Sequence, residues 1–435
     1  MSLARLLLAA FALAVLVGIA ALFSTERSRI AWRAVPAGIA LQIAFAAVVL
    51  KVPAGRVVLD AVAGAFVKLL GFVNVGSEFV FGSLVDTSRF GFVLAVQVLP
   101  TIVFFASLTG VLYHLGVMQR VVKAMAWAVT KVMNVSGAEA TVVSASVFVG
   151  QTEAPLTVRP YIEGMTQAEL MTMMVGGMAH VAGSVMAAYV GLLGGDDPDE
   201  RRFYAKHLLA ASAMAAPATL LIAKLLVPET GVPATRGTVV IEAHRTTSNV
   251  IDAAAAGAAD GLKLALNVGA MLLAFVALIA LVNAPIHWLG EAPLGHGGAS
   301  IDGWLSGLSG RPVELSLQVV LGAVMAPLAW LIGVPWHDAP LVGSFLGEKV
   351  VLNEFVAYVD LSRHLSELEA QSRVVATYAL CGFANFASIA IQIGGIGSLA
   401  PGRRHDLARL GLRAVLGGSL ATLMTATIAG VLTPM

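Results

Sequence analysis

The chain has 435 residues, of which 58% are hydrophobic and 12% are charged, and its formal net charge is +1. Soluble domains carry about 25% charged residues, so this composition predicts an integral membrane protein. The net charge gives no sign of a nucleic-acid partner. The single cysteine, Cys381, excludes an intramolecular disulfide and a cysteine-cluster metal site.

Apolar segments along the chain predict an all-α membrane protein with eight transmembrane helices. The segments are 3–23, 34–50, 90–115, 168–194, 203–226, 263–288, 373–395 and 411–432. No cleavage motif closely follows the first segment, so we expect a retained membrane helix rather than a signal peptide. Three segments mix apolar and charged or small residues and are expected to lie as interfacial helices, namely 57–70, 118–133 and 249–263.

Two further apolar regions, 135–165 and 313–361, are interrupted by glycine, proline and a polar string. The strings are Gly150-Gln151-Thr152-Glu153 and Asn353-Glu354-Phe355-Val356-Ala357-Tyr358. Non-helical backbone at membrane depth is tolerated only inside protein or beside a water-filled cavity, so both regions predict re-entrant hairpins. A charge at the bilayer centre costs roughly 2.5–3.5 kcal/mol. Two such carboxylates therefore indicate a polar ligand bound near the midplane, as in secondary transporters.

The basic residues predict the orientation in the membrane. Arg27, Arg29 and Arg33 follow the first span, so this loop is expected in the cytoplasm and the N-terminus in the periplasm. Alternation then places Arg236 and Arg245 inside and the C-terminus in the periplasm. The first hairpin would enter from the cytoplasm and the second from the periplasm of a multi-pass protein in a bacterial inner membrane.

A similarity between two parts of the sequence predicts an inverted repeat. Each hairpin is followed by a glycine-led polar break within a span, at 177–184 and at 382–388. Opposed hairpins with matching breaks are typical of inverted-topology repeats. The predicted division is a scaffold over 1–115, a first repeat over 116–226, an interfacial helix, the sixth span and a periplasmic loop over 227–312, and a second repeat over 313–435.

Residues 347–358 read GEKVVLNEFVAY. This string resembles the G-x-K-x3-N-E-F-V-A signature of the concentrative nucleoside transporters, and 150–153 and 382–386 are similar to other motifs of that family. The resemblance implies a homotrimer in the lipid bilayer, a nucleoside held between the hairpins, no enzymatic activity and no cofactor. It implies nucleobase contacts by Gln151, Thr152, Glu153 and Val185, and ribose contacts by Glu354, Asn385 and Ser388 with Phe383 nearby.

The chemistry of these residue types agrees with that assignment. A glutamine amide pairs with adjacent donors and acceptors of a base edge. Ribose hydroxyls donate to a carboxylate in charge-assisted hydrogen bonds. Val185 and Phe383 would cover the flat faces of the ligand, whereas Lys349 is expected to be structural and to neutralise a neighbouring carboxylate.

The coupling ion stays open between Na+ and H+. In sodium-coupled members the resemblance implies an ion between the first hairpin and the following break, held by backbone carbonyls and by asparagine and serine side chains. The matching positions here are Ser146 and His180, with carbonyls from Val149 and Val181. An imidazole is a poor sodium ligand and titrates near neutral pH, so His180 or a nearby carboxylate could carry a proton. Alternatively, sodium binds Ser146, the two carbonyls and water.

Other functional classes fit the sequence less well. Residues 307–310 read GLSG, the pattern of an intramembrane serine protease, but no helix-borne histidine partner is evident. Neither H-E-x-x-H nor a Gly-rich phosphate loop is present. The sequence therefore predicts a cation-coupled symporter that imports nucleosides by alternating access. The alternatives are a transporter of another small polar solute, such as a nucleobase, and a channel.

Overall fold

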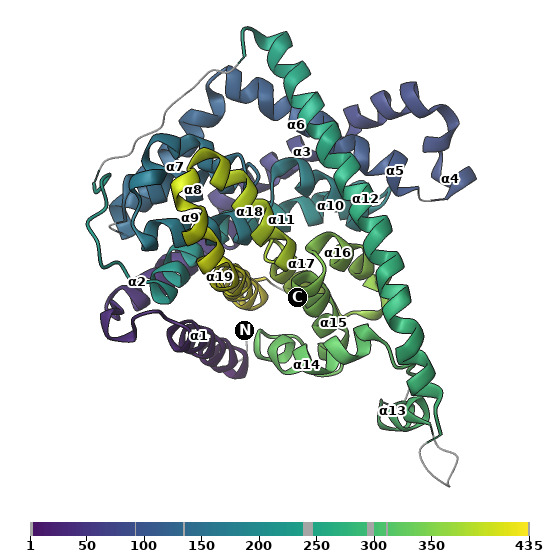
Figure 1. Ribbon diagram of the computed structural model, residues 1–435. Coiled ribbons are helices and arrows are strands. Elements are labelled where there is room, and N and C mark those ends of the chain that lie inside the picture. The colour runs from purple at the N-terminus through teal and green to yellow at the C-terminus, as the bar shows by residue number, and fades with distance from the viewer. Residues whose placement is uncertain are drawn as a thin grey trace.

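A computed structural model describes residues 3–91, 93–133, 135–237, 247–293, 300–309 and 312–433, and over these ranges the chain is built from helices (Figure 1). Two isolated β-bridges join Ser136 to Arg236 and Pro293 to Ser300. Arg245 of the orientation argument and Gly310 of the protease pattern lie outside the described residues.

The N-terminal part contains α1 (Leu3–Leu22), α2 (Ala34–Leu50), α3 (Pro53–Phe81), the short α4 (Thr87–Phe90) and α5 (Leu94–Gln97), α6 (Leu99–His114) and α7 (Val117–Met133). The segment 57–70, expected as a short interfacial helix, differs from that expectation. It belongs to α3, a 29-residue helix that begins with a proline in its first turn and ends at Phe81, with Gly82 as its C-cap. Because the apolar sequence continues past its sparse charges, α3 is long and apolar enough to cross a membrane.

The next part contains α8 (Gly137–Ser146), the 3-10 helix η3 (Ala154–Gly164), α9 (Gln167–Ala179), α10 (Gly183–Gly194) and α11 (Pro198–Leu226). Both α8 and α9 begin with a capping box, formed by Ser136 with Glu139 and by Thr166 with Glu169. The two capping boxes are joined, because Ser136 Oγ donates to Glu169 Oε1 at 2.6 Å. The region 135–165 is thus a short helix, a turn and a 3-10 segment, not one clean span.

The C-terminal part contains α12 (Val250–Glu291), α13 (Ile301–Ser309), α14 (Leu317–Leu331), α15 (Ala339–Val351), α16 (Glu354–Arg363), α17 (Ala370–Leu380), α18 (Phe386–Leu399) and α19 (Arg404–Leu432). The expected interfacial segment 249–263 and the sixth span are one continuous helix of 42 residues, α12. The region 313–361 contains three helices, and α15 and α16 form the two arms beside the polar string.

Seven helices or helix pairs are long and apolar enough to cross a membrane: 3–22, 53–85, 94–114, 167–194, 198–226, 250–291 and 401–432. Six of them coincide with predicted spans. The remaining two predicted spans correspond to shorter apolar helices, Val35–Leu50 and Phe386–Leu399, the latter preceded by α17. The chain is an all-helical multi-pass membrane protein, as the composition predicts.

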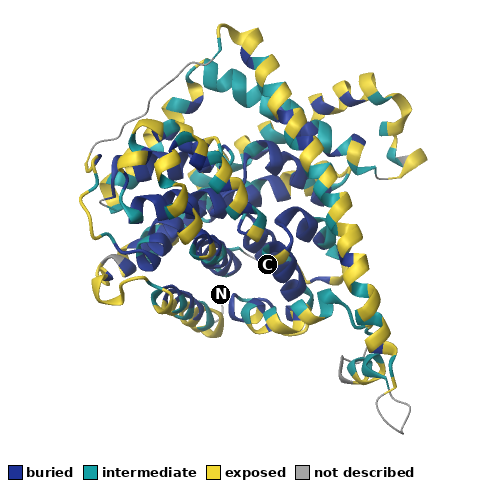
Figure 2. Cartoon of the chain, viewed as in Figure 1, coloured by how far each residue is buried: buried dark blue, intermediate teal, exposed yellow. Residues whose placement is uncertain are grey.

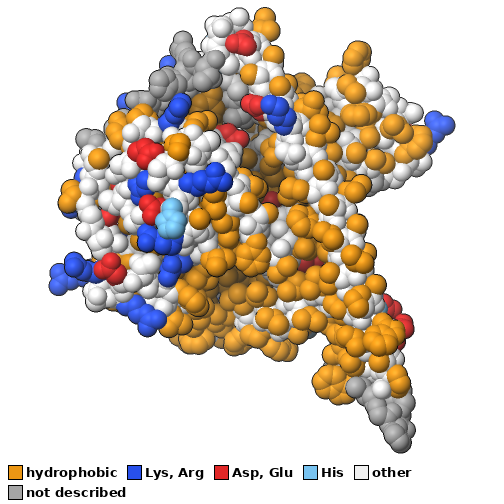
Figure 3. All heavy atoms as spheres, in the orientation of Figure 1, with side chains coloured by type: hydrophobic (Ala, Val, Ile, Leu, Met, Phe, Trp, Pro, Cys, Tyr) orange, Lys and Arg blue, Asp and Glu red, His pale blue; other side chains and the backbone are white. Residues whose placement is uncertain are grey.

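Burial divides the helices into an inner and an outer group (Figure 2). In the span formed by α9 and α10, 94% of the apolar window is buried inside the protein, against 17% for α3 and for α12. Figure 3 shows apolar side chains spread over the surface along α12 and α14, while most Lys and Arg side chains of this face lie on its left side. A protein in lipid is expected to expose apolar helices on its outside and to keep its polar side chains in its interior.

Candidate functional site

Two broken helices meet at the centre of the protein. Between α9 and α10, His180 has extended backbone with φ −118° and ψ 166°. Between α17 and α18, Gly382 has φ 147°, a conformation that favours glycine. A Cβ at Gly382 would lie 2.7 Å from the carbonyl oxygen of Met178, so the two breaks are in contact. The glycine-led breaks predicted from the sequence therefore exist and contact one another.

Asparagines cap the helices that leave the second hairpin and the second break. Asn353 Oδ1 accepts a hydrogen bond from the Val356 amide at 2.9 Å and starts α16. Asn385 Oδ1 accepts from the Ser388 amide, also at 2.9 Å, and starts α18. Such N-caps satisfy amide groups that a helix leaves unpaired. Both caps place their helix N-termini beside the polar residues of the site.

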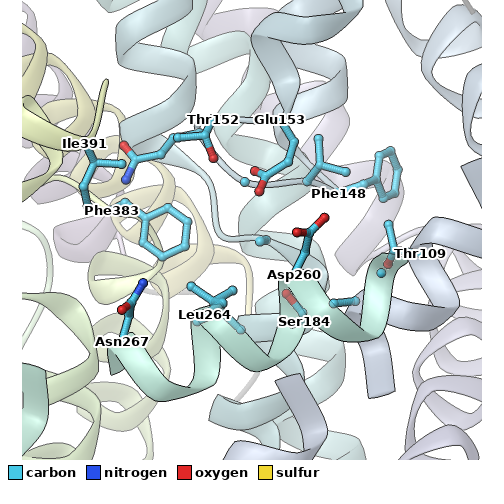
Figure 4. A pocket seen from close by; sticks show the side chains of 18 of the residues that line it. Thr109, Phe148, Thr152, Glu153, Ser184, Asp260, Leu264, Asn267, Phe383 and Ile391 are labelled. Carbon is cyan, nitrogen blue, oxygen red and sulfur yellow. The ribbon is translucent and has the colours of Figure 1, made fainter. Parts of the chain in front are cut away.

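A cavity of about 980 Å³ lies beside these breaks (Figure 4). Its walls come from α6, the turn after α8, α10, α12, the start of α16 and the break before α18. All eight residues that the sequence nominated for substrate line it: Gln151, Thr152, Glu153, Val185, Glu354, Phe383, Asn385 and Ser388. The structure thus brings residues from both hairpins and both breaks to one space.

Glu354 is the most constrained acidic group of this cavity. Its Oε1 accepts from the Tyr189 hydroxyl at 3.0 Å, and its Oε2 accepts from Asn385 Nδ2 at 3.0 Å. The residue is only 6% exposed. Because an ionised carboxylate can accept about four hydrogen bonds, Glu354 keeps acceptor capacity for a ligand.

Lys349 lies one helical turn before the second polar string and makes structural contacts. Its Nζ donates to the Ala379 carbonyl at 2.7 Å and to Thr422 Oγ1 at 3.0 Å. These bonds join α15 to α17 and α19. Lys349 is not among the described residues that line the cavity.

Gln151 links the first hairpin to the second repeat. Its Nε2 donates to Ser388 Oγ at 3.2 Å, and its Oε1 accepts from Gln392 Nε2 at 3.1 Å. Gln392 Nε2 also donates to the Met174 carbonyl at 3.0 Å. The amide of Gln151 is therefore oriented by neighbours that are far away in the chain.

Glu153 has different surroundings from Glu354. It is exposed to the cavity, and Figure 4 shows its carboxylate in the same space as Asp260 of α12, with Thr109 and Ser184 nearby. Together with Asn267, Asp260 and Thr109 line the wall formed by the outer helices α6 and α12. The sequence analysis does not predict that these residues line the cavity. A carboxylate within the alanine-rich segment 249–263 is nevertheless a sequence feature that could indicate such a role.

Tyr189 and Gln392 were also missed, for a different reason. Tyr189 lies in an apolar stretch of α10, and its partner Glu354 is 165 positions away. Gln392 follows Ser388 by four residues on α18, so both lie on one helix face. That spacing is the only sequence signal for Gln392.

The residues nominated for the coupling ion lie beside the first break. Ser146 Oγ donates to the Val142 carbonyl at 2.9 Å, and the Gly183 amide donates to the Phe148 carbonyl at 2.9 Å, which holds the hairpin turn against the break. Val149 lines the cavity, whereas Ser146, His180 and Val181 are buried and are not among its described lining residues.

His180 has one bonded and one free ring nitrogen. Its Nδ1 lies 2.7 Å from the Gly176 carbonyl, which can only accept, so Nδ1 carries a hydrogen and donates it. Its Nε2 is buried and has no hydrogen-bond partner among the described residues. In the neutral ring this nitrogen carries a lone pair that can accept a proton.

Comparison with known proteins identifies the family. Residues 11–84 match a family model described as "Na+ dependent nucleoside transporter N-terminus", and residues 207–430 match the corresponding C-terminus. Residues 95–196 match a model described as "Nucleoside recognition". The chain belongs to the concentrative nucleoside transporter family. It is therefore a transporter and not an enzyme, as the sequence predicts.

Relatives and solved structures agree with this placement. The chain is 46% identical over 423 residues to an "Uncharacterized transporter" of Haemophilus influenzae, covering 96% of this chain and 95% of that protein. It is 38% identical over 428 residues to the nucleoside permease NupC of Helicobacter pylori, covering 96% of both.

The fold matches the structure of CNTnw in an inward-facing substrate-bound state, with a TM-score of 0.85, 44% identity and 98% of both chains covered. A CNTnw variant in an outward-facing state matches with a TM-score of 0.86, 44% identity, and 99% of this chain and 98% of that chain covered. These matches show that the chain has the concentrative nucleoside transporter fold.

Proposed function

We propose that this protein is a cation-coupled symporter that imports nucleosides across a bacterial inner membrane by alternating access. The observation that supports it most directly is the buried Tyr189–Glu354–Asn385 cluster at the end of a cavity that also contains Gln151 and Ser388. The name of the Helicobacter relative, a nucleoside permease, and the descriptions of the family models point to the same ligand class.

In this proposal the ribose occupies the Glu354 end of the cavity. Ribose hydroxyls donate to the carboxylate, and such charge-assisted bonds are about twice as strong as neutral ones. Asn385 and Ser388 orient the sugar, and Phe383 covers its apolar face. Free nucleobases lack these hydroxyls, so the cluster favours a nucleoside over a nucleobase, the second candidate.

The base occupies the first-hairpin end. There the oriented amide of Gln151 faces the base edge, with Thr152 and Glu153 beside it and Val185 against the flat face. A cavity of about 980 Å³ is at the upper end of the range usual for small-molecule sites, which leaves room for water around the ligand.

Alternating access in this proposal moves the inner helices against the outer ones. The inner group carries both hairpins and both breaks, whereas α3, α6 and α12 form the static outer part. We propose eight spans with two opposed hairpins in an inverted repeat, both termini in the periplasm, and a homotrimer whose contacts use the outer helices. The exposed apolar faces of α3 and α12 support an outer role for these helices.

For the coupling ion, the family description favours Na+, held by Ser146, the carbonyls of Val149 and Val181 and water. The free Nε2 of His180 favours H+ as the second candidate. Replacing Ser146 with asparagine and His180 with serine restores the oxygen-rich side chains of sodium-coupled members. Uptake by this double variant is expected to depend more strongly on sodium than uptake by the wild type. An unchanged sodium dependence would show that His180 is not part of the coupling site.

The deciding experiment is uptake of radiolabelled uridine and adenosine into proteoliposomes under separate sodium and proton gradients. We expect concentrative uptake under one gradient and its loss in Glu354→Gln. The control is Glu26→Gln, since Glu26 lies on the surface and its side chain is 51% exposed. No uptake of either nucleoside under either gradient would overturn the proposed function.

A further inference from the structure

A chain of three hydrogen bonds passes through the side chain of Gln151. It begins at the backbone carbonyl of Met174 on α9, which accepts from Gln392 Nε2 at 3.0 Å. The same nitrogen donates to Gln151 Oε1 at 3.1 Å, and Gln151 Nε2 donates to Ser388 Oγ at 3.2 Å. The chain therefore connects the helix before the first break, the tip of the first hairpin and α18, which are far apart in the sequence.

The direction of these hydrogen bonds is set at the Met174 end. A backbone carbonyl can only accept, so the group of Gln392 that faces it must be the NH2 group. The second hydrogen of that NH2 group needs an acceptor, so the atom of Gln151 that faces it must be the amide oxygen. The NH2 group of Gln151 is then at the Ser388 end. Turning both amides over would place the Gln392 oxygen against the Met174 carbonyl oxygen, with no hydrogen between these two acceptors.

Gln392 lies behind Gln151 as seen from the cavity. Gln151 is 8% exposed and lines the cavity. Gln392 is 0% exposed and is not among the described residues that line it. Any effect of Gln392 on a ligand in the cavity therefore passes through Gln151.

Packing alone does not explain a glutamine at position 392. Its Oε1 is buried and has no hydrogen-bond partner among the described residues, which is unfavourable for a polar atom. A methionine has a similar length and would fill the same space without an unpaired oxygen.

A glycine provides the room in which the two amides meet. A Cβ at Gly177 of α9 would lie 2.6 Å from Gln392 Nε2 and 2.8 Å from Gln151 Cβ. Both contacts are closer than a side-chain carbon allows, so the absence of a side chain at position 177 lets Gln392 lie between α9 and the hairpin tip.

We propose that Gln392 is a positioning residue for the nucleobase: held by the Met174 carbonyl, it fixes which way the Gln151 amide points. Each end of that amide has one hydrogen bond to the protein, so one lone pair of Oε1 and one hydrogen of Nε2 are left for a ligand. The base thus meets an acceptor and a donor in a fixed order, and an amide oriented in advance loses less freedom when a ligand binds. The part that concerns the base rests on the proposed function, whereas the orientation of Gln151 does not.

Solid-state NMR of the full-length protein in lipid, with 15N-labelled glutamine side chains, tests the orientation. The Gln151 signal is identified by its loss in Gln151→Ala. Gln392→Met keeps the length of the side chain and removes both hydrogen bonds that Gln392 donates. We expect the NH2 signal of Gln151 to shift and its hydrogens to exchange faster with water. An unchanged Gln151 signal in folded Gln392→Met would overturn the proposal.

Uptake kinetics test the effect on the ligand. We expect Gln392→Met to raise the KM for uridine about fivefold, as for the loss of one net hydrogen bond, and to change kcat by less than about twofold. An unchanged KM would overturn the positioning role.

Gln371→Met is the matched control. Gln371 is also 8% exposed or less, its Nε2 donates to the Gly333 carbonyl at 2.6 Å, and it is not among the described residues that line the cavity. We expect this change to lower the melting temperature and to leave the KM unchanged. An equal rise of the KM in Gln371→Met and Gln392→Met would show that the effect is not specific to Gln392 and would overturn the proposal.

A double variant separates positioning from general packing. Once Gln151 is an alanine, Gln392 has no amide to orient. Gln151→Ala combined with Gln392→Met is therefore expected to have the same KM as Gln151→Ala alone. A KM that rises by the product of the two single effects would overturn the positioning role.

If Gln392→Met does not fold, Gln392→Asn replaces it. The shorter amide keeps a polar group at this position but cannot bond both Met174 and Gln151. The same rise of the KM and the same lack of additivity with Gln151→Ala are expected, and their absence would contradict the proposal in the same way.

A failure of the proposed function gives a different pattern. In that case the wild type takes up no uridine under either gradient, while the NMR signal of Gln151 still shifts in Gln392→Met. The orientation of Gln151 and the nucleoside function are thus tested separately.

Discussion

Glu354 and Glu153, the acidic residues of the cavity that come from the two hairpins, differ in how they are held. Glu354 is buried, and each of its oxygens accepts a hydrogen bond from a side chain on another helix. Glu153 is exposed to the cavity and faces the outer wall near Asp260. The second-hairpin end is therefore preorganised for one ligand group, whereas the first-hairpin end can adjust to different bases.

The largest effect is expected for Glu354→Gln, which tests the rigid end. The change removes the charge that ribose hydroxyls bind and places an amide NH2 beside Tyr189 or Asn385, both of which donate. We expect a loss of about 3 kcal/mol in substrate binding, or more than 100-fold in uptake efficiency. Uptake kinetics with uridine measure it, and a loss below about threefold would contradict the preorganised role of Glu354.

Gly382→Ala tests whether the contact between the two breaks holds the Glu354 end of the cavity in place. The new Cβ would lie 2.7 Å from the Met178 carbonyl, and the backbone has φ 147°. We expect a loss of about 2 kcal/mol or more in stability, seen as a lower melting temperature in detergent. Gly394→Ala on α18 is the matched control, because nothing lies within 4 Å of its added Cβ. Equal melting temperatures for the two variants would show that the contact at Gly382 does not matter.

Gln151→Ala tests the link between the two ends. Gln151 bonds Ser388 and Gln392 across the repeats, so its removal takes away a base contact and the order of the site. We expect a loss of about 1.5 kcal/mol, or roughly tenfold, in uptake efficiency. If the loss is instead restricted to one nucleoside, Gln151 reads the base and does not organise the site.

Glu153→Gln is expected to have the smallest effect on total uptake and to change selectivity. An exposed carboxylate in a wet cavity contributes about 1 kcal/mol or less, so we expect less than about fivefold for any one nucleoside. Competition between uridine and adenosine measures the change. A loss of uptake as large as that in Glu354→Gln would contradict the proposed difference between the first-hairpin and second-hairpin ends of the cavity.

The same contrast separates what the sequence predicts from what it does not. Residues of the two polar strings and the glycine-led breaks were found because each stands out locally against apolar flanks. Tyr189 and Gln392 were missed because their roles come from packing between α10, α16 and α18, distant in the chain. The residue types alone do not indicate a functional role, because a tyrosine within an apolar helix and a glutamine four residues after a serine are common in membrane proteins.

The differences in the fold have a similar cause. The length of α3 was underestimated because its early charges suggested an interface, whereas the helix continues through apolar residues to Phe81. The sequence predicts one hairpin over 313–361, whereas α14 is a separate helix that packs closely on α15 through Gly322 and Gly343. Such glycine contacts are set by the partner helix, which the local pattern does not contain.

The one cysteine of the chain lies in the break between α17 and α18, where it is buried. It is therefore a built-in reporter of that break. A thiol reagent would leave Cys381 unlabelled while the break stays packed, and labelling that begins during turnover would time its opening. While the break stays packed, cysteines introduced on the outer helices could be labelled without removing the buried native residue.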